Sequence, residues 1–209
     1  MALTLSTLKS KALVYFRDRT DLATYMQDGV DFATDYFSQK LRVREMMTQA
    51  TLTPDVDGIC TLPDDFIELI SVTEDIGYGV PLDQMTDVGI GATYYAGTTG
   101  IGYNYKVFGD TLRLYPSSEN DVVILYYATI PALVEGDVGT ETNWLLEKFP
   151  NAYLDYVRMW AADIADEGGN HEAKYAGKVD NFIETLNDRH QTSMYARVTT
   201  DLSDEVIIP

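Results

Sequence analysis

The feature of this sequence that most constrains its fold is a change in the spacing of its apolar residues. Near both ends apolar side chains recur every three or four residues, as Leu5, Leu8 and Ala12 do. Between residues 46 and 141 the period is two, and turn residues separate runs rich in Val, Ile, Thr and Tyr. The first period is typical of helices and the second of strands. The order predicts an α+β fold, with a helical bundle formed by the N- and C-terminal helices and a central, mostly antiparallel β-sheet or small barrel.

The same patterns predict where each part begins and ends. We expect N-terminal helices of the bundle over residues 1–45, a central β region over 46–141, C-terminal helices over 142–197 and an extended C-terminal arm over 198–209. The N-terminal part contains a helix over 4–17 and a second helix that ends near residue 44. The expected strands are 47–53, 58–62, 66–74, 103–108, 111–115 and 122–129, with a short helix over 83–88.

The C-terminal part is expected to form an antiparallel helix pair. Pro150 suits the first turn of one helix, Gly168 and Gly169 end it, and Asn170 can cap the next. Matching apolar stripes predict that the two helices pack together. The stripes are Leu145, Phe149, Tyr156 and Trp160 on one side and Val179, Phe182 and Leu186 on the other.

The charge of the chain is strongly negative and unevenly distributed. The formal net charge is −18. Residues 51–141 contain 15 acidic side chains, against which only Lys106 and Arg113 are basic. Such a segment repels the phosphates of nucleic acid and cannot neutralise them. The charge therefore argues against tight DNA binding.

Cysteine content and hydropathy predict the compartment. Cys60 is the single cysteine and has no partner for an internal disulfide. No run approaches the roughly 20 apolar residues that a membrane-spanning helix needs. We expect a soluble protein that is made and kept in a reducing cytosol.

Two glycine-containing segments resemble ligand loops only superficially. In the Gly-rich stretch 89–102, Tyr94 stands where a dinucleotide fingerprint needs its third glycine. A mobile connection between strands is the favoured interpretation. Asp55 to Gly58 begins like a calcium loop but lacks the closing Glu, so a β-turn explains it.

Catalytic and metal sites have weak support. His171 has acids such as Glu167 nearby, but Gly168 and Gly169 interrupt the one-face spacing that helical ligands require. The pair Asp64 and Asp65 could serve acid–base catalysis, yet such pairs are common in a chain with 33 acids. We expect no catalytic, cofactor-binding or metal residues.

Two groups of residues are candidates for an interface. Tyrosine is favoured at protein interfaces, and the chain contains 15 of them. Three adjacent β-branched or apolar residues near the C-terminus follow a polar stretch, and exposed they would favour aggregation. They are expected either to dock on a neighbouring subunit or on another protein of the same assembly, or to cover the chain's own helices. The candidates are Tyr94, Tyr95, Tyr103 and Tyr105 in the first group and Val206, Ile207 and Ile208 in the second.

Three segments together resemble a known family. They are Leu62 to Val72 (LPDDFIELISV), Gly109 to Leu133 (GDTLRLYPSSENDVVILYYATIPAL) and Thr142 to Ile164 (TNWLLEKFPNAYLDYVRMWAADI). In this order they are similar to the head-to-tail adaptor proteins of tailed bacteriophages, also described as head completion or connector proteins. The resemblance covers about half of the chain.

The resemblance implies a structural subunit of the virion and no enzyme activity. Family members form a ring, commonly of twelve subunits, beneath the phage portal protein. Helices surround the channel, and the β parts contact the downstream tail or nozzle protein. The ring joins capsid to tail at the head–tail junction, retains packaged double-stranded DNA and lets it pass at ejection, after assembly in the host cytoplasm. Solvated carboxylates would keep the DNA from adhering.

Other functions remain open from sequence. The chain could be another phage neck or tail ring protein. A carbohydrate-binding or hydrolytic β domain is a further alternative, but the helix–sheet–helix order disfavours it because binding sandwiches are normally all-β.

Overall fold

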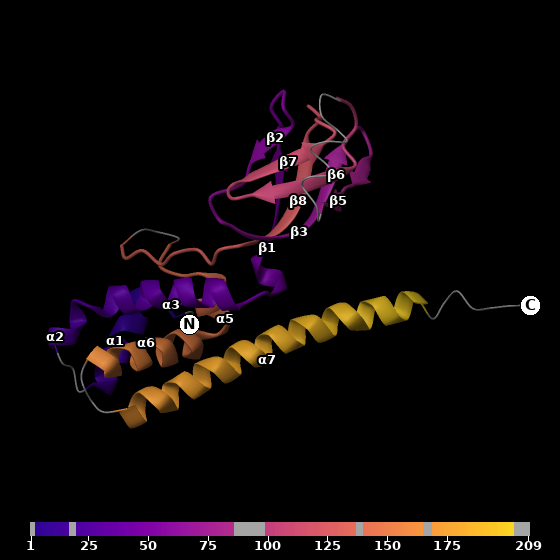
Figure 1. The fold of residues 1–209 in the computed structure, drawn as a ribbon. Helices are drawn as coiled ribbons and strands as arrows, with labels where there is room; N and C mark the ends of the chain where they lie inside the picture. The colour runs from indigo at the N-terminus through magenta and orange to yellow at the C-terminus, as the bar shows by residue number, and fades with distance from the viewer. Residues whose placement is uncertain (1–2, 17–19, 86–98, 137–139, 165–168, 203–209) are drawn as a thin grey trace, which may run out of the picture. The chain divides into compact units, whose positions relative to one another are not determined.

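The computed structural model of the chain describes residues 3–16, 20–85, 99–136, 140–164 and 169–202 (Figure 1). The chain divides into a helical unit, Met1–Glu45 with Ile130–Pro209, and a β unit, Met46–Thr129. The α+β class is confirmed. The β unit ends before the boundary at residue 141 that we expected, and it is an insertion within the helical unit.

The first helices of the helical unit follow the predicted pattern closely. The helix α1 spans Leu5–Tyr15 and is capped by Thr4, whose hydroxyl accepts a hydrogen bond from the backbone N–H of Thr7. The short helix α2 spans Thr20–Ala23, where we expected only a break. The helix α3 spans Met26–Lys40, and the 3-10 turn η1 spans Arg44–Met46.

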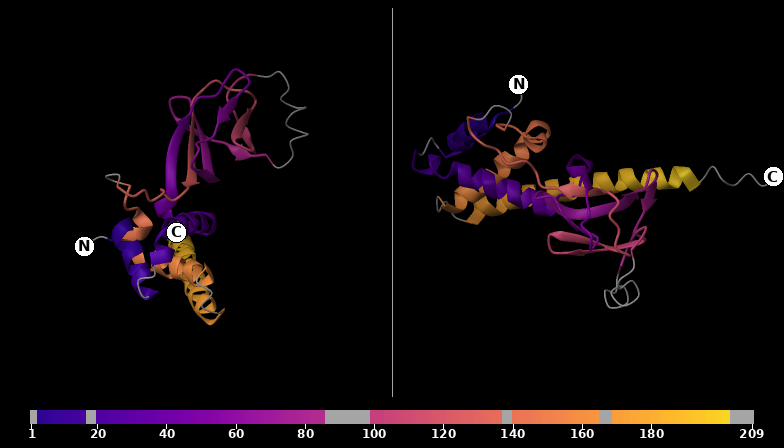
Figure 2. Two further views of the ribbon diagram at one scale, coloured as in Figure 1. Left: turned by 90° about the vertical axis from the view of Figure 1, so that its left-hand side faces the viewer. Right: turned by 90° about the horizontal axis from the view of Figure 1, so that it is seen from above.

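Three helices form the C-terminal part of the helical unit. The helix α5 spans Trp144–Lys148, α6 spans Pro150–Ile164 and α7 spans Gly169–Leu202. Pro150 opens α6 as predicted. The helix α7 begins one position before Asn170 and continues past residue 197, where we expected the arm to begin. It also continues beyond the ends of α3 and α6 (Figures 1 and 2).

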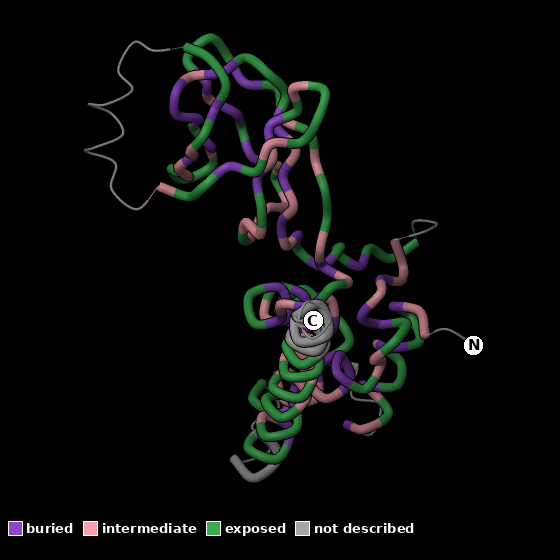
Figure 3. Tube along the Cα trace, turned by 90° about the vertical axis from the view of Figure 1, so that its right-hand side faces the viewer, coloured by how far each residue is buried: buried purple, intermediate pink, exposed green. Residues whose placement is uncertain are grey.

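The helix α6 is the centre of the helical unit, because it packs against α1, α3, α5 and α7. The expected contact between the last two helices, α6 and α7, is present. In addition, the ring centroid of Phe182 on α7 lies 5.4 Å from that of Phe149, which directly precedes α6. Trp160 also packs on α3, where its ring centroid lies 6.3 Å from that of Phe32. The described part of α7 is mostly exposed (Figure 3), with Tyr175 and Val179 buried.

The β unit consists of two four-stranded sheets. Their strand orders are β1-β8-β3-β4 and β2-β7-β6-β5. Every pairing is antiparallel except that of β5 with β6. In chain order the strands are β1 Met47–Leu52, β2 Ile59–Thr61, β3 Phe66–Asp75, β4 Gly79–Pro81, β5 Asp83–Gln84, β6 Asn104–Phe108, β7 Thr111–Tyr115 and β8 Val122–Ala128.

The strand β5 replaces part of the short helix that we expected over residues 83–88. The backbone N–H of Asp83 donates to the carbonyl of Tyr103 at 3.0 Å, and that of Met85 donates to the carbonyl of Tyr105 at 2.9 Å. These bonds to the neighbouring strand satisfy backbone groups that a helix would satisfy internally. The helix prediction is therefore wrong for residues 83–85, and residues 86–88 lie outside the described part.

One apolar core lies between the two sheets. Alternate residues of β8, including Val122, Ile124 and Tyr126, point into it, as the period of two predicts. Leu112 and Leu114 enter it from the other sheet and are fully buried. At the edge of the unit, β1 and β8 pair so that Met47 lies opposite Tyr127. The two points where the chain enters and leaves the β unit are therefore neighbours.

Candidate interaction surfaces

The structure describes only part of the predicted interface. Tyr103 is 59% exposed, whereas Tyr105 is buried in the core of the β unit. Burial, followed by the negative charge of Asp83, raises the pKa of Tyr105. Within the subunit Tyr105 therefore serves the core, and Tyr103 is the member of the pair that offers surface. Tyr94, Tyr95, Val206, Ile207 and Ile208 lie outside the described residues.

A fully buried carboxyl group joins three segments of the β unit. Glu74, near the end of β3, has no exposed surface. One of its oxygens accepts a hydrogen bond from the backbone N–H of Gly102 at 2.7 Å. The other accepts from the hydroxyl of Ser118 and, at 3.0 Å, from the side-chain amide of Asn120. Because every oxygen is satisfied, the carboxyl group holds the loops before β6 and before β8 together.

These loops enclose a pocket of about 420 Å³, which we call the clamp pocket. Val56 and Ile101 contribute apolar surface, and Ser117 contributes a hydroxyl that donates to the carbonyl of Asp57 at 3.0 Å. The remaining lining residues are Thr99, Gly100, Ser118, Glu119 and Asn120. Such a mixture of exposed apolar and polar groups suits a protein contact.

The turn that carries Val56 depends on Gly58. Asp55 closes this turn, because its carboxylate accepts from the backbone N–H groups of Asp57 and Ile59, each at 2.9 Å. The backbone N–H of Gly58 donates to the carbonyl of Asp55 at 2.9 Å, which confirms the β-turn interpretation. Gly58 has a φ of +73°, and a Cβ there would lie 2.9 Å from the Cα of Ser117. Both the backbone angle and the close approach therefore require glycine.

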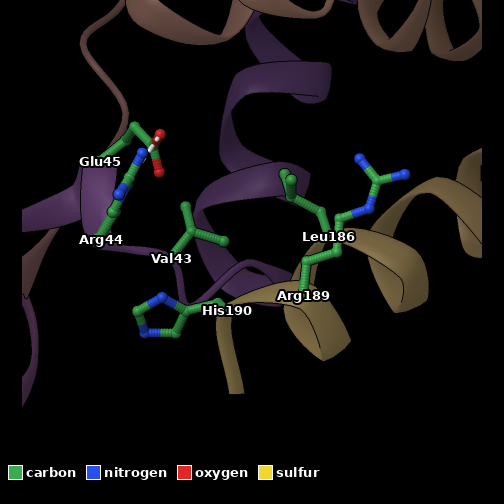
Figure 4. Close-up of a pocket in the computed structure, with 6 residues that line it drawn as sticks. All are labelled: Val43, Arg44, Glu45, Leu186, Arg189 and His190. Atoms are coloured by element: carbon green, nitrogen blue, oxygen red, sulfur yellow. Dashed lines mark ion pairs between the residues drawn. The ribbon is translucent and has the colours of Figure 1, made fainter. Parts of the chain in front are cut away.

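A second pocket lies in the helical unit, between α7 and the segment that follows α3 (Figure 4). Its volume is about 260 Å³. We call it the arginine pocket, and its lining residues are Val43, Arg44, Glu45, Leu186, Arg189 and His190. Val43 and Leu186 supply apolar atoms between the two arginine side chains (Figure 4).

Specific hydrogen bonds hold the walls of the arginine pocket together. The side-chain oxygen of Asn187 accepts from the backbone N–H of Arg42 at 3.0 Å, and its amide donates to the carbonyl of Lys40, also at 3.0 Å. These bonds satisfy the chain where α3 ends and fasten it to α7. The pocket is thus set by two elements that lie far apart in the sequence.

The single acid of the arginine pocket is neutralised by neighbours. Glu45 Oε1 lies 2.9 Å from Lys148 Nζ and 3.6 Å from Arg44 Nε. Burial alone would raise the pKa of Glu45, but the hydrogen bonds to Lys148 and the backbone, with the two positive charges, hold it below its usual value. Arg189 adds a further exposed positive charge. The pocket is therefore suited to an anionic group.

Side chains whose chemical groups could suggest a catalytic role have structural roles in this fold. Cys60 is buried, which raises its pKa to about 11 and removes it as a nucleophile at neutral pH. Asp65 accepts a hydrogen bond from the hydroxyl of Tyr126 at 2.9 Å. Burial and then this bond raise the pKa of Tyr126 to about 12. Among the described residues no group of three potential metal ligands occurs.

Neither pocket was predicted from the sequence, although the sequence contains one indication of the buried carboxyl group beside the clamp pocket. Val72 and Glu74 have the same parity along β3, so the period of two places the carboxyl group on the buried face. The arginine pocket left no local signal, because the packing of α7 beside the segment after α3 brings Arg44 and Arg189 to one pocket from distant parts of the sequence.

Within the described parts of the chain, no helix is both long enough and apolar enough to cross a membrane.

Comparison with known proteins identifies the family. No curated protein matches the chain. The family model described as SU10 adaptor protein matches residues 3–201, nearly the whole sequence. The chain belongs to the SU10 adaptor protein family, which confirms the resemblance to phage head-to-tail adaptors.

Proposed function

We propose that the chain is the head-to-tail adaptor of a tailed phage, in which copies form a ring beneath the portal protein. The family match over residues 3–201 carries this proposal. The ring, of about twelve copies as in the family, joins the capsid vertex to the tail or nozzle protein below. The work of such a subunit is geometric, and it requires surfaces for neighbouring copies and no catalytic centre.

The two pockets supply surfaces of the kind that this role needs. The clamp pocket carries Val56, which is 74% exposed, on a turn that is held rigidly. Rigid loops present an interface without a large loss of conformational entropy on binding. Tyr103 and Tyr78, which are 59% and 70% exposed, add aromatic surface to the same unit. Aromatic side chains often contribute most of the binding energy at interfaces.

Charge supports the passage of DNA without adhesion. In the β unit Lys106 and Arg113 are the only basic residues, and the carboxylates greatly outnumber them. A surface of this sign repels the duplex within roughly a Debye length of about 8 Å at physiological salt. The C-terminal residues Val206 to Ile208 belong to the proposal as a contact to a neighbour.

Assembly on a portal ring tests the proposed function. Purified protein, alone and mixed with the portal protein of the same phage, is examined by sedimentation velocity and negative-stain microscopy. We expect a ring, either free or seated on the portal. A chain that stays monomeric and leaves the portal bare would rule the function out.

A DNA titration tests the charge argument separately. We expect no change in the fluorescence anisotropy of a labelled duplex at physiological salt. Saturable binding at micromolar protein that weakens with added salt would contradict it, because only counterion release at basic contacts gives that dependence.

A further inference from the structure

The arginine pocket is a positively charged pocket on a strongly acidic chain. Arg44 has a side chain that is 78% exposed, and Arg189 is also exposed. The acid Glu45 is paired with Lys148 at 2.9 Å and, through Nε, with Arg44 at 3.6 Å. The terminal N–H groups of Arg44 and the guanidinium of Arg189 therefore retain capacity for charge-assisted hydrogen bonds to a carboxylate from outside. Leu186, which is half-buried, supplies an apolar wall beside them.

One segment of the chain has the complementary chemistry. Residues 203–209 read Ser-Asp-Glu-Val-Ile-Ile-Pro, so that Asp204 and Glu205 directly precede Val206 to Ile208. Adjacent carboxylates and apolar side chains match a pocket that places arginines beside apolar atoms. A partner for the apolar residues also removes the aggregation risk of exposing them.

The length of α7 keeps the carboxylates of this segment away from the arginines of their own chain. From Arg189 to Leu202 the helix rises about 20 Å at about 1.5 Å per residue. Fully extended and turned straight back, the chain from Leu202 to Glu205 covers at most about 11 Å. Side chains on a helix lean toward its N-terminus, so the direction of the Arg189 side chain does not close this gap. A second copy has no such restriction.

We propose that the arginine pocket receives the segment Asp204–Ile208 of a second copy of this chain. The two carboxylates pair with Arg44 and Arg189, and the apolar residues cover Leu186. This inference rests on the proposed ring of copies. Each copy then gives a segment at one place and accepts one at another, which is a heterologous contact. Repeated with rotation, such contacts close into rings.

Disulfide trapping tests the contact directly. His190→Cys, at a pocket position that takes no part in the proposed charge pairing, is made in one full-length protein and Ile208→Cys in another, and the two are mixed and assembled on the portal ring. Cys60 is buried and therefore does not interfere. We expect a covalent pair of chains containing one copy of each variant, at a yield at least tenfold above that with Lys174→Cys. Lys174 is exposed on the same helix but does not line the pocket, so it is the matched control.

Each other result of the trapping overturns the inference. A link between Ile208→Cys and the portal protein would assign the segment to that partner. A protein carrying both cysteines that closes within one chain would show docking in cis. Rings that form without any link above the control would leave the proposed function standing and remove this contact. Absence of rings with the unmodified protein would instead count against the function itself.

Charge reversal gives a second, independent readout. The variant Arg44→Glu/Arg189→Glu is expected to weaken ring assembly at least tenfold, and Lys11→Glu/Lys174→Glu, with the same change in charge at exposed sites, is expected to leave it intact. Adding Asp204→Lys/Glu205→Lys to the pocket variant should restore assembly, because the signs match again. Restoration distinguishes pairing from misfolding. Equal assembly by the pocket variant and the control would refute the proposal.

Discussion

Gly29 shows how one residue can set a helix contact. It lies within α3, and a Cβ at this position would be 2.7 Å from a ring carbon of Trp160 on α6. The glycine thus admits the indole against the helix backbone. Glycine in a helix interior costs about 1 kcal/mol relative to alanine. Here the close packing offsets that cost.

Replacing this glycine should therefore destabilise the helical unit. Gly29→Ala gains helix propensity but forces Trp160 to move, and overpacking of this kind costs about 1 to 3 kcal/mol. Gly177→Ala is the matched control, because nothing lies within 4 Å of its added Cβ. We expect thermal unfolding at a lower temperature for the first variant and a slightly higher one for the second. Stabilisation by both would contradict the packing argument.

The buried carboxyl group of Glu74 has a comparable influence in the β unit. In Glu74→Gln an amide donor replaces one acceptor oxygen and meets another donor, such as the N–H of Gly102. We expect a loss of about 1.5 to 3 kcal/mol in the free energy of unfolding, measured by urea denaturation. Glu119→Gln, at an exposed position of the same pocket, should change it little. Similar losses for both would mean that the three-way contact is dispensable.

At the level of single residues, sequence patterns were only partly informative. They placed Trp160 on an apolar face but did not indicate its contact with α3. Tyr105 was expected at a surface because Tyr is common at interfaces, whereas its parity on β6 turns it into the core. The abundance of Tyr predicts only that some of these side chains lie at interfaces. The pairing of β6 with its neighbouring strand decides that the side chain of Tyr105 points into the core.

Among the elements, α5 depends on a single capping residue with further partners. Asn143 accepts a hydrogen bond from the backbone N–H of Leu146 at 2.9 Å. Its amide donates to the carbonyl of Pro131 at 2.8 Å and to the hydroxyl of Tyr153 at 2.9 Å. The start of the helix is thereby joined both to the segment after the β unit and to the first turn of α6.

Removing the side chain of Asn143 should lower the free energy of unfolding by more than the loss of an ordinary helix cap does. Asn143→Ala loses the cap, worth about 1 kcal/mol. It also leaves the buried hydroxyl of Tyr153 and the carbonyl of Pro131 with fewer partners, for a total of about 2 to 4 kcal/mol. Chemical denaturation followed by circular dichroism measures this loss. Asn151→Ala, at an exposed position of α6, is the control, and an equal effect would refute the role of Asn143.

The ion pair between η1 and α5 predicts a dependence on pH. The pKa of Glu45 lies below its usual 4.5 in the folded chain. The pair therefore contributes stability above the unfolded pKa and loses it as pH falls through the lowered one. Because both side chains are partly exposed, we expect less than about 1 kcal/mol. The difference in melting temperature between the natural chain and Glu45→Gln should be present at neutral pH and vanish in acid. A difference that grows in acid would reverse the assigned sign.

Long elements were predictable and short ones were not. The strands β7 and β8 and the helix α6 follow periodic apolar patterns over their whole length, and the predicted bounds lie close to the observed ones. The elements α2, β4 and β5 are too short to show a period. They exist because neighbouring elements satisfy their backbone groups, which no local pattern records.

On the scale of the whole molecule, the β unit meets the conditions for folding alone. It has its own core between two sheets, and its first and last strands pair along their length. We expect a fragment of residues 46–129 to give the circular dichroism of a β protein and to unfold cooperatively. An unfolded fragment would show that the helical unit is required. Periodicity predicted the insertion's start near residue 46, but its end at Thr129 depends on the β1–β8 pairing.

That pairing has a mechanical consequence. The chain crosses between the units twice, and the crossings leave from adjacent ends of β1 and β8. A pull that separates the units is therefore shared by two covalent tethers anchored side by side. If a protease cut one tether, the other would still carry the load, and the severed strand would stay bonded to its neighbour. In the role proposed above, this insertion of one unit into the other would give a junction under load a redundant attachment.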